Sequence, residues 1–332
     1  MTEYSGTESR APDYPEDWRD LVRRARQSPT EEVPAELHEL FLTDEPERAK
    51  EIHFIERRRS GAALTDLPPV EIAGYRPPWV ETAFRPQRGR QSPRQRVVHQ
   101  GSDLQPLVVW GNDDRKTYND LAYPWGCVCR VITAAGRVGS GVLIGGRHVL
   151  TASHCVDWST SAAETIEVHR SGTSVRATTF DTAAIAFTQI QGSPSGSQLD
   201  EDYAVLVLND RLGDAFGYFG SKLYDSGWDD DHLWTTIGYP TDIGSGLLPT
   251  YQLPVALDED EFDLGSGRAM TTTADACPGQ SGGPMFGMWD GVAYVVAVVS
   301  AVGTVWFSGV ENWCAGGSDL NRLIREARQS DP

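Results

Sequence analysis

Residues 277–284 read Cys-Pro-Gly-Gln-Ser-Gly-Gly-Pro, a glycine-rich stretch with one serine, Ser281, near its centre. Glycine adopts backbone conformations that other residues avoid, so this stretch predicts a tight turn that presents the serine hydroxyl. A serine hydroxyl is a weak nucleophile near neutral pH and needs a neighbouring base to react. Because such a loop alone is usually a plain turn, a histidine and a carboxylate must be sought elsewhere in the chain.

Both groups precede the loop, each beside an apolar run. Residues 149–155 read VLTASHC and carry His154, and Asp202 comes directly before the apolar run Tyr203–Leu208. In this order His154 would take the proton of Ser281, and Asp202 would hold the imidazole in the required tautomer. Asp181 and Asp200 are weaker candidates for the role of Asp202. Asp181 follows His154 closely in the chain, and Asp200 does not directly enter the apolar run.

Short apolar and β-branched runs, separated by turn residues, extend over the chain from about residue 108. The runs are Cys127–Thr133, Ser140–Ile144, Val149–Leu150, Tyr203–Leu208 and Val292–Val302. This regular spacing indicates an all-β barrel or sandwich. One helix is predicted at the end of the chain, over Ser318–Arg328, where the apolar residues share one face.

The order His, Asp, Ser and the two motifs together resemble the chymotrypsin-like serine peptidases. Residues 108–115 (VVWGNDDR) and Gln280 are similar to the bacterial glutamyl-endopeptidase branch, which includes the staphylococcal V8 enzyme. The resemblance covers about residues 108–328. It implies a mainly β fold, with a chymotrypsin-like double six-stranded β-barrel and a C-terminal helix. It also implies a serine endopeptidase that works through an acyl-enzyme intermediate.

The resemblance further implies an oxyanion hole and a substrate pocket. The backbone N–H groups of Gly279 and Ser281 would bind the oxyanion. The expected pocket residues are Asp275, Ala276, Val299, Ser300, Ala301 and Val302, and the last three would offer an edge strand to the substrate backbone. In trypsin-like relatives an aspartate at position 275 selects Arg or Lys, whereas Glu-specific relatives have a histidine where Val299 stands. The pocket is therefore not expected to favour Glu strongly.

Five cysteines leave at least one thiol unpaired within the chain. By the resemblance, Cys277 lies where many relatives have a disulfide, and Cys314 is its possible partner. Cys155 could pair with Cys127 or Cys129, or all five could be free thiols in a reducing compartment. Because Cys-x-Cys lacks the usual two-residue spacing, no metal site is expected, and no cofactor is implied.

The first hundred residues differ from the rest. In residues 1–61, apolar side chains recur at helical spacing, as at Trp18, Leu21, Val22 and Ala25. They predict a small α-helical segment, either a packing or pro-region or a partner-binding module. Residues 62–107 are proline-rich and then basic (RPQRGRQSPRQR at 85–96), which predicts an exposed linker or a processing site. Residues 108–332 would form the protease domain.

This organisation predicts a zymogen or a partner-controlled protease, because the family-like mature start near Val108 follows the basic linker. In relatives a new α-amino group orders the oxyanion hole by pairing with an aspartate. Gln280 stands where that aspartate is expected. Residues 1–61 could instead cover the cleft or recruit a target without any cleavage.

Composition restricts the class of partner. The 332 residues carry a formal net charge of −18, with Asp+Glu 47 against Lys+Arg 29, which disfavours nucleic-acid binding. No apolar run reaches the roughly 18 residues of a membrane span. Residues 1–18 have no basic cluster followed by an apolar stretch, so we expect a cytoplasmic location, or secretion if a signal was removed. The expected partners are a protein or peptide substrate and, through residues 1–61, a possible protein partner.

Two other functions compete with an endopeptidase. One is a catalytically silent protease fold used as a binding scaffold, which a complete triad and oxyanion loop disfavour. The other is an esterase on another fold, because residues 279–283 match the Gly-x-Ser-x-Gly pattern. In that fold the chain order is Ser, acid, His, which is not the order here.

Overall fold

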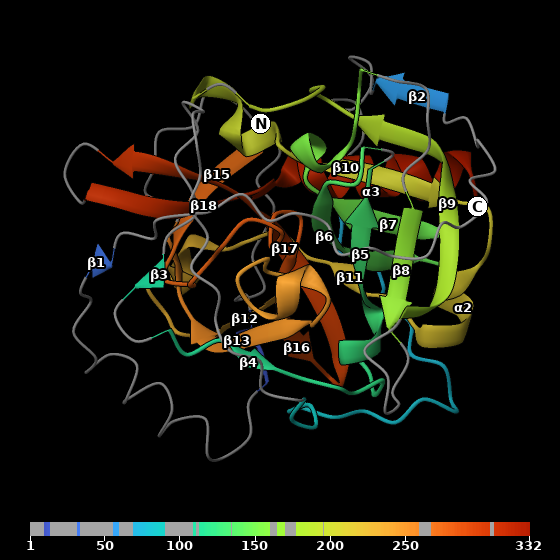
Figure 1. The fold of residues 1–332 in the computed structure, drawn as a ribbon, viewed down its shortest axis with the longest axis horizontal. Coiled ribbons are helices and arrows are strands. Elements are labelled where there is room, and N and C mark those ends of the chain that lie inside the picture. The colour runs from blue at the N-terminus through green and yellow to red at the C-terminus, as the bar shows by residue number, and fades with distance from the viewer. Residues whose placement is uncertain are drawn as a thin grey trace.

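The computed structural model describes residues 10–13, 32–33, 56–59, 69–89, 109–110, 113–133, 135–159, 165–169, 177–194, 196–258, 267–305 and 309–332. Two curled, mainly antiparallel sheets lie side by side, each forming a barrel, and a helix ends the chain (Figure 1). This arrangement confirms the predicted mainly β, chymotrypsin-like fold.

The first barrel is formed by strands between residues 128 and 208 and lies on the right of Figure 1. Its strands are β5 (Val128–Ile132), β6 (Val138–Gly145), β7 (His148–Thr151), β8 (Thr165–His169), β9 (Ala177–Thr188) and β10 (Ala204–Leu208). They pair in the order β10-β7-β6-β5-β8-β9, and β10 also pairs with β9, which closes a ring of six strands. Every residue of β10 is fully buried, because one face fills the barrel and the other is covered.

The second barrel follows in the chain and lies on the left of Figure 1. Its strands are β12 (Trp234–Gly238), β13 (Thr250–Val255), β14 (Leu257–Asp258), β15 (Gly267–Thr272), β16 (Pro284–Trp289), β17 (Val292–Val305) and β18 (Gly309–Gly317). The order is β14-β15-β18-β17-β16-β12-β13, and β14 continues β13 past Ala256, which joins the two ends of the sheet. Two short strands extend it, β4 (Lys116–Thr117) beside β13 and β11 (Gly220–Ser221) beside β17.

Short helices connect these strands, and the predicted terminal helix is confirmed as α3 (Ser318–Ser330). Its apolar face, which includes Leu320, Leu323, Ile324 and Ala327, is buried against the first barrel and β18. The connecting helices are η2 (Trp125–Cys127), η3 (Ser153–Cys155), η4 (Gly196–Glu201), α2 (Leu212–Phe216), η5 (Ser226–Trp228) and η6 (Gly244–Gly246). Among the helices that the structure describes, none has the length and apolar character needed to cross a membrane.

The predicted helical segment over residues 1–61 is wrong for the two pieces that form secondary structure here. Glu32–Val33 is a strand, β1, that pairs with β3 (Val109–Trp110), and Glu56–Arg59 is a strand, β2, parallel to β9. The edge of a sheet presents unpaired N–H and C=O groups, and pairing with them outweighs a local preference for helix. The other residues of the predicted helices, except 10–13, lie outside the described part of the chain.

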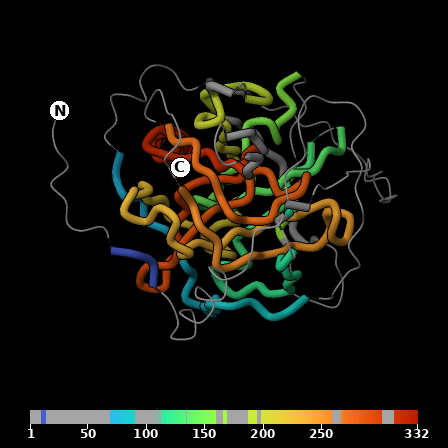
Figure 2. The backbone as a smooth tube through the Cα atoms, turned by 90° about the vertical axis from the view of Figure 1, so that its left-hand side faces the viewer, coloured from blue at the N-terminus to red at the C-terminus, as the bar shows by residue number. Residues whose placement is uncertain are grey.

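Residues 69–89, within the predicted exposed linker, have many exposed side chains but are not a free tether, because they form a strap along both barrels (cyan in Figures 1 and 2). Pro77 and Pro86 are buried, and their fixed backbone angles suit an extended chain lying on a surface. Backbone hydrogen bonds fasten the strap along its length, from Ile72 to Ser221, Tyr75 to Tyr218, Ala83 to Tyr123 and Gly89 to Thr117. Residues 62–68 and 90–107 lie outside the described residues.

Candidate active site

His154 and Asp202 meet where the first barrel faces the second. His154 lies in η3, directly after β7, and Asp202 lies just before β10, which pairs with β7. The Asp202 carboxylate contacts His154 twice: Oδ2 lies 2.7 Å from Nδ1, and Oδ1 accepts the backbone N–H at 3.1 Å. Asp202 is fully buried, whereas 24% of the His154 side chain is exposed. The imidazole is therefore fixed on one side and accessible on the other.

The charges of this pair support one another. Burial opposes the charged form of Asp202, but the charge of His154 and the hydrogen bonds that Asp202 accepts outweigh burial and lower the pKa of Asp202. Burial likewise opposes a charge on His154, but the Asp202 carboxylate outweighs it and raises the pKa of His154 well above its usual range. Because an ionised carboxylate only accepts hydrogen bonds, Nδ1 carries the proton and Nε2 is left as the basic atom.

Ser300 links this pair to the predicted nucleophile. Its Oγ donates to Asp202 Oδ2 at 2.5 Å, and its carbonyl accepts a hydrogen bond from Ser281 Oγ at 3.5 Å. Ser281 is 8% exposed and lies in the loop before β16. The structure thus gathers the three predicted residues from three separate segments, with Ser300 between the acid and the serine.

The loop around Ser281 has the backbone conformation that its glycines predict. Gly279 has φ +95° and Gly282 has φ +82°. A Cβ on Gly279 would lie 2.4 Å from the Tyr239 carbonyl oxygen, and one on Gly282 would lie 2.3 Å from the Ser140 carbonyl oxygen. Both positions therefore require glycine, for their backbone angles and for the close approach of other backbone.

The N–H groups of this loop alternate between bonded and unbonded. Gln280 donates to the Cys277 carbonyl at 3.0 Å, and Gly282 donates to the Val299 carbonyl at 2.7 Å. Within the part of the chain that the structure describes, the N–H groups of Gly279 and Ser281 donate to no acceptor. Two unpaired backbone donors on either side of one residue are the arrangement that binds an oxyanion.

Ser140, in β6, fastens the loop, a role that the sequence analysis did not assign to it. Its Oγ donates to the Gly279 carbonyl at 2.7 Å and accepts the Tyr239 N–H at 2.8 Å, and its N–H donates to the Ser281 carbonyl at 2.8 Å. It therefore ties the first barrel to the nucleophile loop of the second. The only sequence signal was its place between two glycines, Gly139 and Gly141.

The predicted pocket residues precede and follow, in the chain, the loop that carries Ser281. Ala276, Val299 and Ser300 are buried, and Ala301 is half-buried. The register between β17 and β18 shifts between Val299 and Val302, so the intervening backbone leaves the regular ladder. Asp275 is 2% exposed, and its Oδ2 accepts hydrogen bonds from Gln252 Nε2 at 3.1 Å and the Asp114 N–H at 3.3 Å. A pocket role for each of these residues stays a prediction.

The possible disulfide between Cys277 and Cys314 is wrong for this structure, in which all five cysteines are free and buried. Cys314 lies within β18, opposite Met270 and Val299, whereas Cys277 lies beside Asp242. Strand pairing holds Cys314, and the turn before β16 holds Cys277, so the two thiols have different neighbours. Cys155 likewise forms no disulfide, and its Sγ contacts the Ser281 carbonyl at 3.4 Å.

The rival aspartates lie elsewhere. Asp181 belongs to β9, opposite Ile166 of β8. Asp200 lies in η4, with its carboxylate beside Gly267, and burial raises its pKa. The carboxylate that contacts His154 is therefore the one that enters β10, as the sequence predicted.

Comparisons with known proteins show the family and the fold of the chain. A family model described as Trypsin matches residues 113–306, more than half of the chain. No curated protein matches the sequence. Among solved structures, the chain is similar to one described as a Glu endopeptidase in complex with MPD, at 18% identity and a TM-score of 0.50. That likeness covers 66% of this chain and 98% of the other, and at this identity it shows the fold alone.

Proposed function

The chain belongs to the trypsin family of serine proteases and is a serine endopeptidase, and from this premise we propose that His154, Asp202 and Ser281 are its catalytic triad. The observation that carries the proposal is the 2.7 Å contact between His154 and Asp202, beside a loop in which the N–H of Ser281 and the N–H of Gly279 are both unpaired. The substrate is a protein or peptide, and the reaction passes through an acyl-enzyme.

Each group has one task in this reaction. His154 Nε2 takes the proton of Ser281 as Oγ attacks the carbonyl carbon of the scissile bond. The N–H groups of Gly279 and Ser281 bind the oxygen that becomes negative, a contribution of about 3 kcal/mol per donor. The C–N bond then breaks, and the leaving amine takes the proton from His154. A water molecule repeats the sequence in reverse to release the acid and regenerate Ser281.

A covalent probe tests the proposal. A fluorophosphonate reacts with an activated serine and leaves a phosphonyl group on its oxygen, which peptide mass spectrometry can locate. We expect labelling at Ser281 that is lost in His154→Ala. No labelling would indicate a catalytically silent protease fold that serves as a binding scaffold. Labelling at another serine would show that the nucleophile is that residue and not Ser281.

The pH dependence of kcat/KM is expected to report His154. Only neutral imidazole can accept the proton, and Asp202 raises the pKa of His154 above its reference value of 6.5. Activity should therefore rise with pH through a midpoint above 6.5 and be lost as the pH falls below it. The matched control is His148→Gln, because burial lowers the pKa of His148 to about 4 and it plays no part in the site. A flat profile between about pH 5 and 8 for the acylation step would contradict the assignment.

We expect the substrate pocket not to favour Glu strongly before the cut. Val299 is 1% exposed, and its carbonyl accepts the Gly282 N–H, so an apolar side chain stands beside the nucleophile loop. An apolar group cannot offset the cost of burying a carboxylate. A positional peptide library measures the preference, with Val299→His as the variant expected to increase cleavage after Glu. A preference of the wild type for Glu above about a hundredfold would show that Val299 has been wrongly placed in the pocket.

We also propose that the N-terminal region regulates the protease domain. Residues 10–13 lie against the turn between β16 and β17, where Asp13 N–H donates to the Met288 carbonyl at 2.6 Å and Trp289 Nε1 donates to the Arg10 carbonyl at 2.7 Å (dark blue in Figure 2). With the strap, these contacts support control by a region that stays bound to the barrels.

Cleavage at a site engineered between residues 90 and 108 tests this regulation. Cut and uncut chains are compared on a small peptide and on a folded protein substrate, and gel filtration shows whether the N-terminal piece remains attached. Regulation predicts that the two forms differ on at least one substrate. Equal rates on both substrates, after the piece has been removed, would make residues 1–107 a stabilising appendage only.

A further inference from the structure

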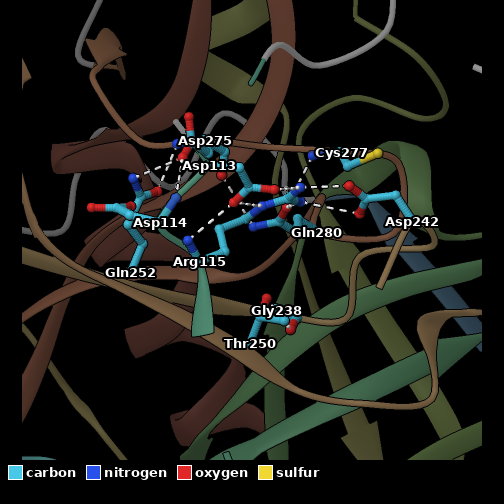
Figure 3. A network of polar contacts seen from close by, with 10 residues as sticks. All are labelled: Asp113, Asp114, Arg115, Gly238, Asp242, Thr250, Gln252, Asp275, Cys277 and Gln280. Carbon is cyan, nitrogen blue, oxygen red and sulfur yellow. Dashed lines mark hydrogen bonds and ion pairs between the residues drawn. The ribbon is translucent and has the colours of Figure 1, made fainter. Parts of the chain in front are cut away.

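A fully buried guanidinium lies behind the nucleophile loop (Figure 3). Arg115, which precedes β4, has a side-chain exposure of 0%, and carboxylates bind it on two sides. Its Nε and Nη2 donate to Asp113 at 3.0 and 2.7 Å, and its Nη1 and Nη2 donate to Asp242 at 3.2 and 2.5 Å. Burial opposes the charge, but the two carboxylates outweigh it and raise the pKa of Arg115. Two-point contacts of this kind fix the plane of the guanidinium.

The same guanidinium also contacts the residue next to Ser281. Nη1 of Arg115 donates to Gln280 Oε1 at 2.6 Å. The two residues are 165 positions apart in the chain, and both are buried. Arg115 therefore joins the segment before β4 to the loop that carries the nucleophile.

Gln280 in turn folds the loop around its own side chain. Its Oε1 also accepts the Cys277 N–H at 2.9 Å, and its Nε2 donates to the Asp275 carbonyl at 3.3 Å. Its N–H donates back to the Cys277 carbonyl. These three bonds fix the turn from Asp275 to Gln280. The unpaired N–H of Gly279 belongs to the Pro278–Gly279 peptide group inside this turn, and that of Ser281 to the peptide group that follows Gln280.

Asp242 ties the cluster to the second barrel. It lies in the loop after β12, where Thr241 N–H donates to the Pro278 carbonyl at 2.8 Å. The Arg115 guanidinium thus has a fixed position between Asp242, in the loop after β12, and Gln280, in the nucleophile loop. Because it is a side chain of the continuous chain, it is in place without any new terminus.

We propose that Arg115 is the positioning residue of the oxyanion loop: acting through Gln280, it holds the N–H groups of Gly279 and Ser281 in the arrangement that stabilises the transition state, so the uncut chain is catalytically competent. This inference rests on the proposed triad. It makes activation by a new α-amino group, one of the alternatives that the sequence left open, unnecessary.

The first variant separates the loop from the cation. Gln280→Ala removes the contact to the loop but leaves both Arg115 ion pairs, so the fold is expected to survive. We measure kcat and KM of the uncut chain, verified by mass spectrometry, on a fluorogenic peptide from the library. The expected result is a fall in kcat of at least about 100-fold with KM changed by less than about threefold, as when an oxyanion donor is displaced.

The second variant removes the cation without leaving unpaired charge. Arg115→Met is combined with Asp113→Asn and Asp242→Asn, because removing one partner of a buried ion pair strongly destabilises a protein. The same loss of kcat is expected. The matched control removes another buried ion pair, Arg130 with Glu167, whose Nη1 and Oε2 are 2.6 Å apart. Arg130→Met with Glu167→Gln should lower the melting temperature but leave kcat within about threefold below that temperature.

Several outcomes overturn the proposal. One is a folded Gln280→Ala chain whose kcat stays within threefold of wild type, and another is an equal loss of kcat in the Arg130 control. If Gln280→Ala does not fold, the triple variant decides by the same criteria, and failure of both to fold means that Arg115 supports the fold alone. A wild-type chain that is inactive until cut before Arg115 also overturns it, while the proposed function survives. Inactivity of both cut and uncut chains overturns both.

Discussion

Replacement of Ser281 by alanine is expected to lower turnover on a peptide substrate by about 10^6, the usual cost of losing a serine nucleophile. The variant should fold as the wild type does, because Ser281 Oγ makes only a 3.5 Å contact with the Ser300 carbonyl in the described residues. The backbone contacts that hold the loop, such as the bond from Ser140 N–H to the Ser281 carbonyl, do not involve the side chain. The measurement is kcat on the fluorogenic peptide together with the melting temperature.

The control for this variant is Ser221→Ala. Ser221 is 1% exposed, and its Oγ contacts Asn321 Nδ2 at 3.1 Å, so this substitution also removes a buried hydroxyl. It lies in β11, outside the proposed site, and activity should be unchanged. Retention of more than a hundredth of wild-type activity by Ser281→Ala, with no wild-type contaminant, would show that Ser281 is not the nucleophile.

The sequence signals for the proposed triad are local. The glycines around Ser281, the histidine after β7 and the aspartate before β10 each stand in a short motif at a strand end. Strand pairing then brings the motifs together, as β10 lies beside β7. The alternation of apolar runs with turns likewise predicts strands and an all-β barrel or sandwich, because the apolar residues mark the buried part of each strand. The two barrels are implied by the family resemblance.

The contacts that sequence analysis missed join residues far apart in the chain. Nothing near Arg115 indicates that its guanidinium reaches Gln280, and nothing in the strap indicates that Ile72 and Tyr75 pair with Ser221 and Tyr218. The helical prediction failed for β1 and β2 for the same reason, since the edge of a distant strand offers hydrogen bonds that local propensity does not reveal. Contacts with residues far away in the chain therefore determine the structure of β1, β2 and the strap. The proline-rich composition that suits a linker also suits an extended chain bound to a surface.

Asp202→Asn is expected to lower kcat by about 10^4 with little change in KM, because it changes which nitrogen of His154 carries the proton. The wild-type carboxylate accepts three hydrogen bonds, from the His154 backbone N–H, from Nδ1–H and from Ser300 Oγ. An amide has one oxygen and one NH2 group in the same space. Placing the NH2 against the backbone N–H would set two donors face to face, so the oxygen must take that position.

The NH2 group of the substituted side chain then faces Nδ1, which must accept a hydrogen bond and lose its proton. The proton moves to Nε2, and the atom that should take the proton of Ser281 becomes a donor. Nitrogen NMR of labelled imidazole measures this directly, with Nδ1 protonated in the wild type and Nε2 protonated in the variant. The midpoint of the pH profile should also fall, because the carboxylate that raises the pKa of His154 is gone. If the variant keeps its activity within tenfold of wild type, or keeps the proton on Nδ1, Asp202 does not control the tautomer and the third member of the triad must be another group.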